Sequence, residues 1–452
     1  MQSNQDIEMM AVKIIEVTVE DIRFPTSDEL VGSDAMHTNP DYSCAYVTLR
    51  TNVPNLVGVG TTFTLGKGTD VVVECAKALN EQFIGKSVVG IVKDYPNFYR
   101  SITSEPQLRW VGPEKGVLHL ATAALLNAFW DLYAKIQRKP LWKVFVDMTP
   151  EELVGLLDFR YLSDVITKEE AITMLKKLEP TKQTREKEML ELGYPSYTTS
   201  AGWMGYSDEK ITRLCKGAIE EGFSHIKIKV GADIEDDIRR CRLIRSILGP
   251  DRKLMVDANQ RWDVNQAIDY MKRLAEFNPW WIEEPTSPDD ILGHAAIAKA
   301  IAPLKVATGE QCQNRIIFKQ LLQSNAISFC QPDSCRLAGP TEVITVMILC
   351  AKFGVPVCMH AGGVGLCEYV NHLCIIDYII VSGSLENRIS EYVPHLNEHY
   401  IHPSIMKKTR YQCPSHSGYG GGLKEQTIKD HRYPNGPVWL SKNKPPVHEK
   451  NA

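Results

Sequence analysis

The sequence predicts an α/β protein in which a (β/α)₈ barrel follows a separate α+β domain. From about residue 197 the chain alternates short β-rich runs with helical stretches, and eight such runs can be counted. Three acidic residues, Asp257, Glu283 and Glu310, stand 26 and 27 residues apart, each behind an apolar run. Because one strand plus one helix takes about that length, the acids fall at the ends of successive parallel strands.

The eight predicted strands can be followed in order along the chain. They are YTTSA near 197, HIKIKV at 225–230, KLMVDA, WWIEE, KVATG, ISFCQ near 329, VPVCMH and IIVSGS near 381. The stretches between them are helical in pattern, and DDIRRCRLIRSILG ends at Gly249, a favourable C-cap. In such a barrel the chemistry lies at the carboxyl ends of the strands.

The rest of the chain divides around this repeat. Residues 1–150 mix β-like runs such as CAYVTLRT with helical patterns such as HLATAALLNAFWDLYAKI, which indicates an α+β domain. The barrel is assigned to 151–395, although 153–196 do not fit the repeat: VGLLDFRYL predicts a strand, and the charged segment to Gly193 predicts a helix or an insertion. Residues 396–452 are expected to leave the barrel and pack on the first domain.

Composition excludes several classes of function. With 452 residues, 44% hydrophobic and 23% charged, the chain is long enough for a sizeable core and two domains. A net charge of −4 and the lack of a long basic run argue against nucleic-acid binding. Twelve cysteines are scattered from Cys44 to Cys413 without a C-x-x-C pair, so reduced, mostly buried thiols are expected.

No membrane-spanning helix is expected. The longest apolar stretch, Val343–Met359, is broken by Lys352 and Gly354 and falls short of the roughly 18–20 residues needed to cross a bilayer. The N-terminal residues lack a basic flank followed by an apolar core. A cytoplasmic location is therefore expected from sequence signals.

Two lysines in HIKIKV are the first candidates for catalysis. Lys227 and Lys229 are separated by one residue on a strand, which places both ammonium groups on one face. Mutual repulsion, burial and a nearby metal ion would lower the pKa of at least one and make a neutral amine available as a base. The alternative is an exposed edge strand with solvated lysines.

The three acids at the strand ends predict a metal site. Hard divalent cations such as Mg²⁺ favour oxygen ligands, whereas clustered carboxylates without a cation would repel one another and become protonated. The alternative is that each acid caps the helix that follows it. Because strand residues alternate between faces, only one of Glu283 and Glu284 can point inward, and the pattern does not choose between them.

Asp333 and His360 follow the next two strands, 27 residues apart. Neighbouring strand ends would place the carboxylate against the imidazole, fixing its tautomer and raising its pKa so that it can deliver a proton. The alternative is a structural histidine. The AGGVG run after His360, which contains Ala361 and Gly362, would permit close approach of the backbone to a substrate.

These motifs together carry a family resemblance. The set K-x-K, D-x-N, E-E-P, G-E-Q, D-S-C-R and H-A-G, in this order and spacing, resembles the mandelate racemase branch of the enolase superfamily. The segments RFPTS, DAMHTNPDYS, WIEEPTSPDDILGHA and HAGGVGLCEYV are similar to the L-fuconate dehydratase group, also called the mitochondrial enolase superfamily member 1 group. The resemblance runs over essentially the whole chain.

The resemblance implies a fold and a set of site residues. The fold would be a modified TIM barrel under an α+β capping domain, with Mg²⁺ held by Asp257, Glu283 and Glu310. Lys229 would remove the proton α to the carboxylate of a sugar acid, and His360, oriented by Asp333, would protonate the departing 3-hydroxyl group. The residues expected to contact substrate are Gly32, Ser33, Asp34, Tyr42, Lys227, Asn259, Ala361, Gly362 and Glu391.

The implied activity is the Mg²⁺-dependent removal of water from L-fuconate to give 2-dehydro-3-deoxy-L-fuconate through an enediolate. Lysine or histidine bases with Mg²⁺ are established chemistry for this superfamily. The alternatives are a dehydratase or epimerase of another acid sugar, and a scaffold relative without catalysis. A homo-oligomer is expected, with a small-molecule acid sugar and neither nucleic acid nor membrane as partner, and the resemblance adds the mitochondrion as an alternative location.

Overall fold

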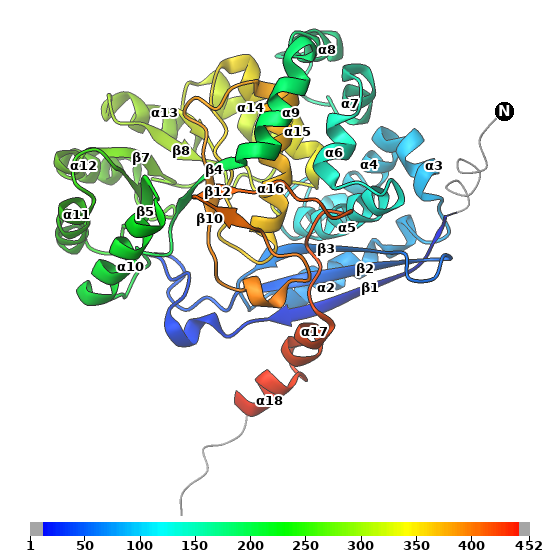
Figure 1. Ribbon diagram of the computed structural model, residues 1–452, viewed down its shortest axis with the longest axis horizontal. Helices are drawn as coiled ribbons and strands as arrows, with labels where there is room; N and C mark the ends of the chain where they lie inside the picture. The colour runs from blue at the N-terminus through cyan, green and yellow to red at the C-terminus, as the bar shows by residue number, and fades with distance from the viewer. Residues whose placement is uncertain (1–11, 443–452) are drawn as a thin grey trace, which may run out of the picture.

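The computed structural model describes residues 12–442. The chain begins with an antiparallel sheet in the order β1-β2-β3, formed by Ile14–Arg23, Ser43–Thr51 and Val57–Thr64. The long helix α5 (Gly116–Ile136) packs against β3 and β2, and the sheet and its helices lie beside the barrel (Figure 1). The other helices of this part are α2 Thr69–Ala78, α3 Val88–Lys93, α4 Tyr95–Thr103 and α6 Leu141–Val146.

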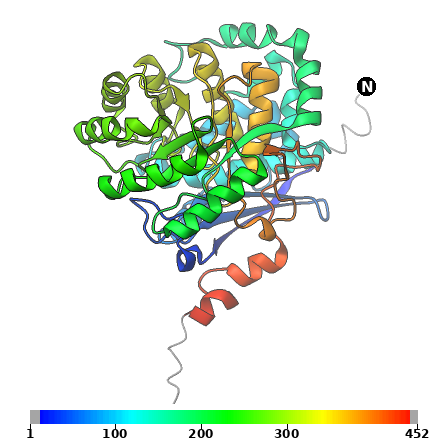
Figure 2. The same cartoon turned by 60° about the vertical axis from the view of Figure 1, so that its left-hand side comes forward.

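The barrel follows the expected alternation of strands and helices. Its hydrogen-bonded strands are β4 Tyr194–Thr198, β5 His225–Lys229, β6 Lys253–Asp257, β7 Pro279–Glu283, β8 Val306–Thr308, β9 Phe329–Cys330 and β10 Ser390–Tyr392. The outer helices are α10 Asp208–Glu221, α11 Ile234–Leu248, α12 Val264–Leu274, α13 Ile291–Ala300, α14 Arg315–Gln323, α15 Pro340–Phe353 and α16 Leu366–Ile376. Figure 2 shows several of these helices covering the outside of the strands. The first barrel strand, β4, lies where the sequence predicts it.

Closure of the barrel corrects the predicted eighth strand. Residues 356–360 take the place of a barrel strand, here called a stave, beside β9. Val357 forms a parallel β-bridge with Cys330 of β9. The last stave is β10, which pairs with β4 in parallel and donates the Glu391 N–H to the Met359 carbonyl at 3.2 Å. The run IIVSGS is wrong as a strand, because Asp377–Ser382 continue α16 as a wider helical turn. A short apolar run buried on all sides looks alike as helix or strand in sequence.

The segment before β4 is helical. It contains α7 (Pro150–Leu156), α8 (Lys168–Lys176) and α9 (Lys182–Leu192). The strand predicted for VGLLDFRYL is wrong, since its first residues belong to α7 and the rest is turn. Thr149 starts α7 with a capping box, in which its hydroxyl accepts from the Glu152 N–H while the Glu152 carboxylate accepts from the Thr149 N–H.

The α5 helix contains the run HLATAALLNAFWDLYAKI, which the sequence predicts to be helical. It is the one helix within residues 12–442 long and apolar enough to cross a membrane, and 89% of its most apolar window is buried inside the protein. Packing of α5 against the sheet and the barrel accounts for its composition.

The C-terminal segment runs from the barrel to the first sheet. The hairpin β11–β12 (Met406–Lys407 and Arg410–Tyr411) adds to the edge of β4, and α17 (Glu425–His431) and α18 (Pro437–Lys442) lie below β1 (Figure 1). The Trp439 indole donates to the Arg23 carbonyl at 3.0 Å. How the chain divides into independently folding domains stays a prediction.

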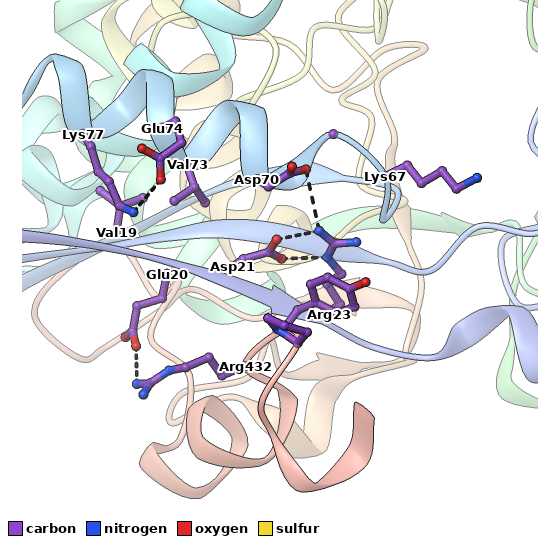
Figure 3. Close-up of a pocket in the computed structure, with 13 residues that line it drawn as sticks. Val19, Glu20, Asp21, Arg23, Lys67, Asp70, Val73, Glu74, Lys77 and Arg432 are labelled. Atoms are coloured by element: carbon purple, nitrogen blue, oxygen red, sulfur yellow. Dashed lines mark hydrogen bonds and ion pairs between the residues drawn. The ribbon is translucent and has the colours of Figure 1, made fainter. Parts of the chain in front are cut away.

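A groove of about 740 Å³ lies where this segment meets β1 and α2. In Figure 3 the Arg23 guanidinium bonds Asp21 at 2.6 Å and faces Asp70 at 3.8 Å. The same guanidinium stacks 3.6 Å from the centre of the Tyr433 ring. None of the predicted site residues lines this groove.

The cysteines behave as expected. All twelve are free, and ten of them are buried. Burial raises the pKa of several of these thiols, for example that of Cys358 to about 12, so they are protonated and pack as small apolar side chains.

Candidate active site

A layer of polar side chains closes the top of the barrel interior. Below it lies a buried apolar plug formed by Tyr197, Met255, Trp281, Ala307, Phe329, Cys358 and Ile389. Strand side chains alternate, so the residue two positions further along each stave points inward again, one layer higher. For six staves those residues are Thr199, Asp257, Glu283, Gln331, His360 and Glu391. Alternation above an apolar plug therefore brings four of the candidate residues, Asp257, Glu283, His360 and Glu391, into one layer.

Three acids of this region form a cluster with the geometry of a metal site. Asp257 lies directly opposite Glu283 in the β6–β7 register, and oxygen atoms of these residues and Glu310 lie within 4.8 Å of one another. It is the one such cluster of three potential ligands within the described part of the chain. The chain bends at Gly309 (φ 150°), where a Cβ would come within 2.6 Å of the Gln331 carbonyl oxygen.

The electrostatics of this acid cluster favour a divalent cation. All three residues are buried, and one Glu310 oxygen has no hydrogen-bond partner. Burial and the neighbouring acids outweigh the opposing effect of Lys227 and raise the pKa of Glu283 to about 8. Three buried oxygen donors at this spacing fit a hard ion such as Mg²⁺. Glu284 is not in the cluster; its carboxylate accepts from the Gln260 amide at 2.7 Å.

Both lysines of β5 reach the acid cluster, from one side. The Lys229 ammonium lies 2.5 Å from the Asp257 carboxylate. The Lys227 ammonium lies 2.5 Å from Glu283, 3.2 Å from Glu391 and 3.7 Å from Asp257. An exposed edge strand is therefore excluded, since both side chains are buried.

The prediction that the pKa of at least one of these lysines is lowered is wrong. Burial lowers the pKa of Lys229, but attraction by Asp257, Glu310 and Asp34 outweighs burial and repulsion from Lys227, and the pKa is raised. The pKa of Lys227 is raised as well, by Glu283 and Glu391. The carboxylates opposite the two lysines stabilise their charged forms more than the repulsion between the cations destabilises them.

His360 lies on the other side of the acid cluster. Its Nδ1 is 2.7 Å from the Asp333 carboxylate, and its Nε2 is 3.4 Å from Glu310 and 3.8 Å from Glu391. Burial lowers the pKa of His360, but Glu310, Asp333 and Glu391 outweigh that effect and raise the pKa to about 9. The imidazole is therefore protonated at neutral pH and can act as an acid.

Replacing Asp333 with asparagine is expected to move the alkaline limb of the pH–rate profile to lower pH. Asp333 contributes to the raised pKa of His360, so its removal lowers that pKa. An acid must be protonated to act, so activity is lost as pH rises through the pKa, and in the variant that loss comes earlier. Measuring kcat from pH 6 to 10 tests this shift, and an unmoved limb would separate Asp333 from the titration of His360.

Glu391 joins the two halves of the site. One of its carboxylate oxygens accepts from the Ala361 N–H at 3.0 Å, and the other accepts from the Thr199 hydroxyl. Burial opposes its charge, but Lys227, His360 and Lys229 keep the pKa of Glu391 below its usual range. A Cβ on Gly362 would lie 3.1 Å from the His360 Nε2, so a side chain there would crowd the imidazole.

The loop after β1 reaches from the sheet to the barrel (Figure 1). The Met204 N–H donates to the Ser33 carbonyl at 2.9 Å, which ties this loop to the segment after β4. Gly32 has φ 78°, and a Cβ there would overlap the Tyr42 hydroxyl at 2.2 Å. Asp34 and Tyr42 are close enough to Lys229 for its charge to act on the pKa of both side chains.

The polar groups of this loop are partly committed to local contacts. The Asp34 carboxylate lies 3.0 Å from His37 Nδ1 and accepts two backbone N–H groups of the loop. The Ser33 hydroxyl donates to the Thr38 carbonyl at 3.0 Å. Asn259, by contrast, is buried beside Asp257 with its side-chain oxygen unpartnered.

Three residues that hold the site in place were missed in the sequence. The Trp281 indole and the Gln331 amide both donate to one Glu283 oxygen, at 3.0 and 2.7 Å, and Thr199 holds Glu391. The period of two along a strand could have found them, since Trp281 precedes Glu283 by two residues, Gln331 follows Phe329 by two, and Thr199 follows Tyr197 by two.

Comparisons with known proteins show the family to which the chain belongs. Residues 210–427 match the family model described as enolase C-terminal domain-like. The crystal structure of human mitochondrial enolase superfamily member 1 is 54% identical and superposes with a TM-score of 0.95, covering 97% of this chain and 100% of that one. L-galactonate dehydratase from Hypocrea jecorina is 48% identical over 431 residues, which cover 94% of this chain and 95% of that protein.

A more distant structure shares the fold. L-talarate/galactarate dehydratase from Salmonella typhimurium LT2, liganded with Mg and L-lyxarohydroxamate, is 24% identical with a TM-score of 0.71, covering 94% of this chain and 95% of that one. The predicted barrel with an N-terminal α+β domain is thus confirmed, as is the predicted family. This chain belongs to the enolase superfamily, within the family of mitochondrial enolase superfamily member 1.

Proposed function

We propose that this chain is a Mg²⁺-dependent sugar-acid dehydratase that converts L-fuconate to 2-dehydro-3-deoxy-L-fuconate and water. The observation that carries the proposal is the order of groups around the barrel. Lys229 lies on the stave before the acid cluster, and His360 lies two staves after it. A substrate held at the cluster would have a base on one side and an acid on the other.

Mg²⁺ would be held by Asp257, Glu283 and Glu310. When bound there, it would offset the charge of these carboxylates and stabilise the second negative charge that develops on the substrate carboxylate. The acid triad of this chain supports this assignment, as does the Mg-liganded superfamily structure of the same fold.

The chain's own residues would then carry the proton transfers. Lys229 would take the proton from the carbon next to the carboxylate, and Lys227, buried among carboxylates, would bind the substrate carboxylate from the same side. His360 would give the proton on Nε2 to the 3-hydroxyl group as it leaves as water. Asp333 would hold the other ring nitrogen and so keep the imidazole oriented.

A panel of sugar acids tests the proposal and its closest rival. L-galactonate differs from L-fuconate only by a hydroxyl group on C6, and the 48% identity to an L-galactonate dehydratase makes it the second candidate. Purified protein with Mg²⁺ is expected to form a keto-deoxy product fastest from L-fuconate. A clear preference for L-galactonate would move the assignment to that acid, and no product from any acid sugar would overturn the dehydratase proposal.

Replacing His360 with asparagine is expected to separate the two proton transfers. Loss of the acid should lower the rate of dehydration between about a hundredfold and about ten thousandfold. Because Lys229 is untouched, exchange of the α-proton should continue in deuterated water. Product formation and deuterium incorporation, measured in one reaction, test this, and normal dehydration by the variant would mean that another group supplies the acid.

A further inference from the structure

A second group of side chains borders the active site and takes no part in the chemistry proposed above. The rings of Tyr42, Trp203 and His395 meet there, from the loop after β1, the segment after β4 and the segment after β10. The His395 ring lies 4.9 Å from Tyr42 and 5.6 Å from Trp203, in edge-on contacts. Phe63 extends the group, 5.0 Å from Tyr42.

His395 is unusual within this aromatic group. Both of its ring nitrogens are enclosed by the protein, and neither has a hydrogen-bond partner. A buried N–H or ring nitrogen without a partner costs stability, so such atoms are rare unless a ligand or water completes them. Asn259 and Glu310, assigned above to substrate and metal, carry buried oxygens in the same state.

His395 is placed to contact the end of a bound sugar acid that lies farthest from its carboxylate. It follows Glu391 by four residues, and Glu391 is the charged group that acts on it. Tyr42, by contrast, is within reach of Lys229 and Glu310 as well as Glu391. Through its ring contact with Tyr42, His395 is therefore joined to the group of residues around the metal cluster, and the carbon chain of a six-carbon acid bound there would extend along these rings.

The charge state of His395 suits a neutral partner. Burial lowers its pKa to about 4, so the ring is uncharged at neutral pH, with one nitrogen as donor and the other as acceptor. A sugar hydroxyl group can accept a hydrogen bond from the first nitrogen or donate one to the second. The Tyr42 and Trp203 rings offer apolar faces to the C–H groups between the hydroxyls.

The segments that carry Tyr42, Trp203 and His395 are each held in place by further contacts. The Arg240 guanidinium donates to the Trp203 carbonyl at 3.3 Å, and the backbone bond from Met204 to Ser33 joins this segment to the loop that carries Tyr42. Leu396 adopts φ 71°, a conformation that leucine seldom takes and that turns the chain directly after His395.

We propose that His395 is a substrate-binding residue that hydrogen-bonds a hydroxyl group on C5 or C6 of the sugar acid, while Tyr42 and Trp203 form the wall against which that end of the carbon chain packs. The inference rests on the proposed sugar-acid function and assigns the recognition of the distal end to a residue outside the metal and proton-transfer groups.

The test replaces His395 with phenylalanine, which keeps an aromatic ring of similar size and removes both nitrogens. Loss of one hydrogen bond is expected to raise KM for L-fuconate or L-galactonate about tenfold, with a smaller change in kcat. A four-carbon sugar acid with the same configuration at C2 and C3 lacks C5 and C6, so its inhibition constant should stay within about twofold of wild type. Asparagine at position 395, which keeps a donor and an acceptor, should recover part of the lost affinity.

The matched control is His399→Phe. His399 is a partly buried histidine of the same segment whose ring packs on Phe24 and His431, and its replacement should leave both constants unchanged. Equal weakening of the six-carbon and four-carbon acids by His395→Phe, or no weakening of either in a protein of normal Tm, would overturn the inference. If wild type turns over no acid sugar, the proposed function fails and this inference falls with it, which separates the two outcomes.

Discussion

Replacing Lys229 with methionine is expected to reduce turnover between about a hundredfold and about ten thousandfold and to abolish α-proton exchange. The side chain lies in hydrogen-bond contact with Asp257 beside the acid cluster, where it alone is assigned the removal of the α-proton. Methionine has nearly the same length and shape but no basic nitrogen. The comparison of dehydration rate with deuterium incorporation at the α-carbon measures the effect.

A lysine-to-arginine variant serves as the control for charge. Arginine at position 229 keeps a cation beside Asp257 but does not lose its proton, so it should be as inactive as the methionine variant. The Lys227 ammonium lies 3.7 Å from Asp257 and limits the loss of stability, so Tm should fall only modestly. Unchanged turnover in Lys229→Met would remove this residue from the mechanism, and an active Lys229→Arg would show that its charge matters rather than its proton.

Replacing Glu283 with glutamine is expected to lower activity about a thousandfold, because several kcal/mol of charge stabilisation depend on the metal ion that it helps to hold. Excess chelator should abolish the activity of the wild-type protein, and added Mg²⁺ should restore it. Metal affinity, measured by calorimetric titration of the metal-free protein with Mg²⁺, should fall in parallel with activity.

The adjacent residue offers a matched control. Glu284 is equally buried, but it lies outside the acid cluster, where its carboxylate accepts from the Gln260 amide. Glu284→Gln removes a carboxylate that is not a predicted metal ligand and should keep activity within about tenfold of wild type. Equal losses in the two variants, or Mg²⁺ binding undiminished in Glu283→Gln, would contradict the assignment of the ligands.

Local sequence pattern predicts most of the barrel strands but not the one that closes the barrel. The strands that carry Asp257 and Glu283 are short apolar runs between clear helices, and their positions follow from local pattern. The run at 379–384 also begins with apolar residues, yet Asp377–Ser382 are helical. The sequence does not separate strand from helix there, because the apolar residues 379–381 are all buried and show no alternation. The stave that closes the barrel, β10, is three residues long and pairs with β4 nearly two hundred residues away.

Other features depend on contacts between distant residues. The raised pKa of Lys229 comes from carboxylates on other segments of the chain. The ring nitrogens of His395 have no partner where that ring packs against Tyr42 and Trp203, which come from two other segments. Neither could be predicted from spacing along the chain. The choice of Glu283 over Glu284 is of the same kind, because it depends on which face of β7 meets the barrel interior.

By itself, the sequence determined the kind of protein: the alternation of strands and helices, the regular spacing of three acids, the paired lysines and the Asp333–His360 pair are all local patterns, and they point to the family and to the chemistry. Tertiary structure alone decided which stave closes the barrel, which carboxylates surround each lysine, and which side chains form the wall beside the site. The reason is physical: a strand's alternation and a helix's period are set by neighbouring residues, whereas burial, pairing and electrostatic environment arise only when distant segments are brought together.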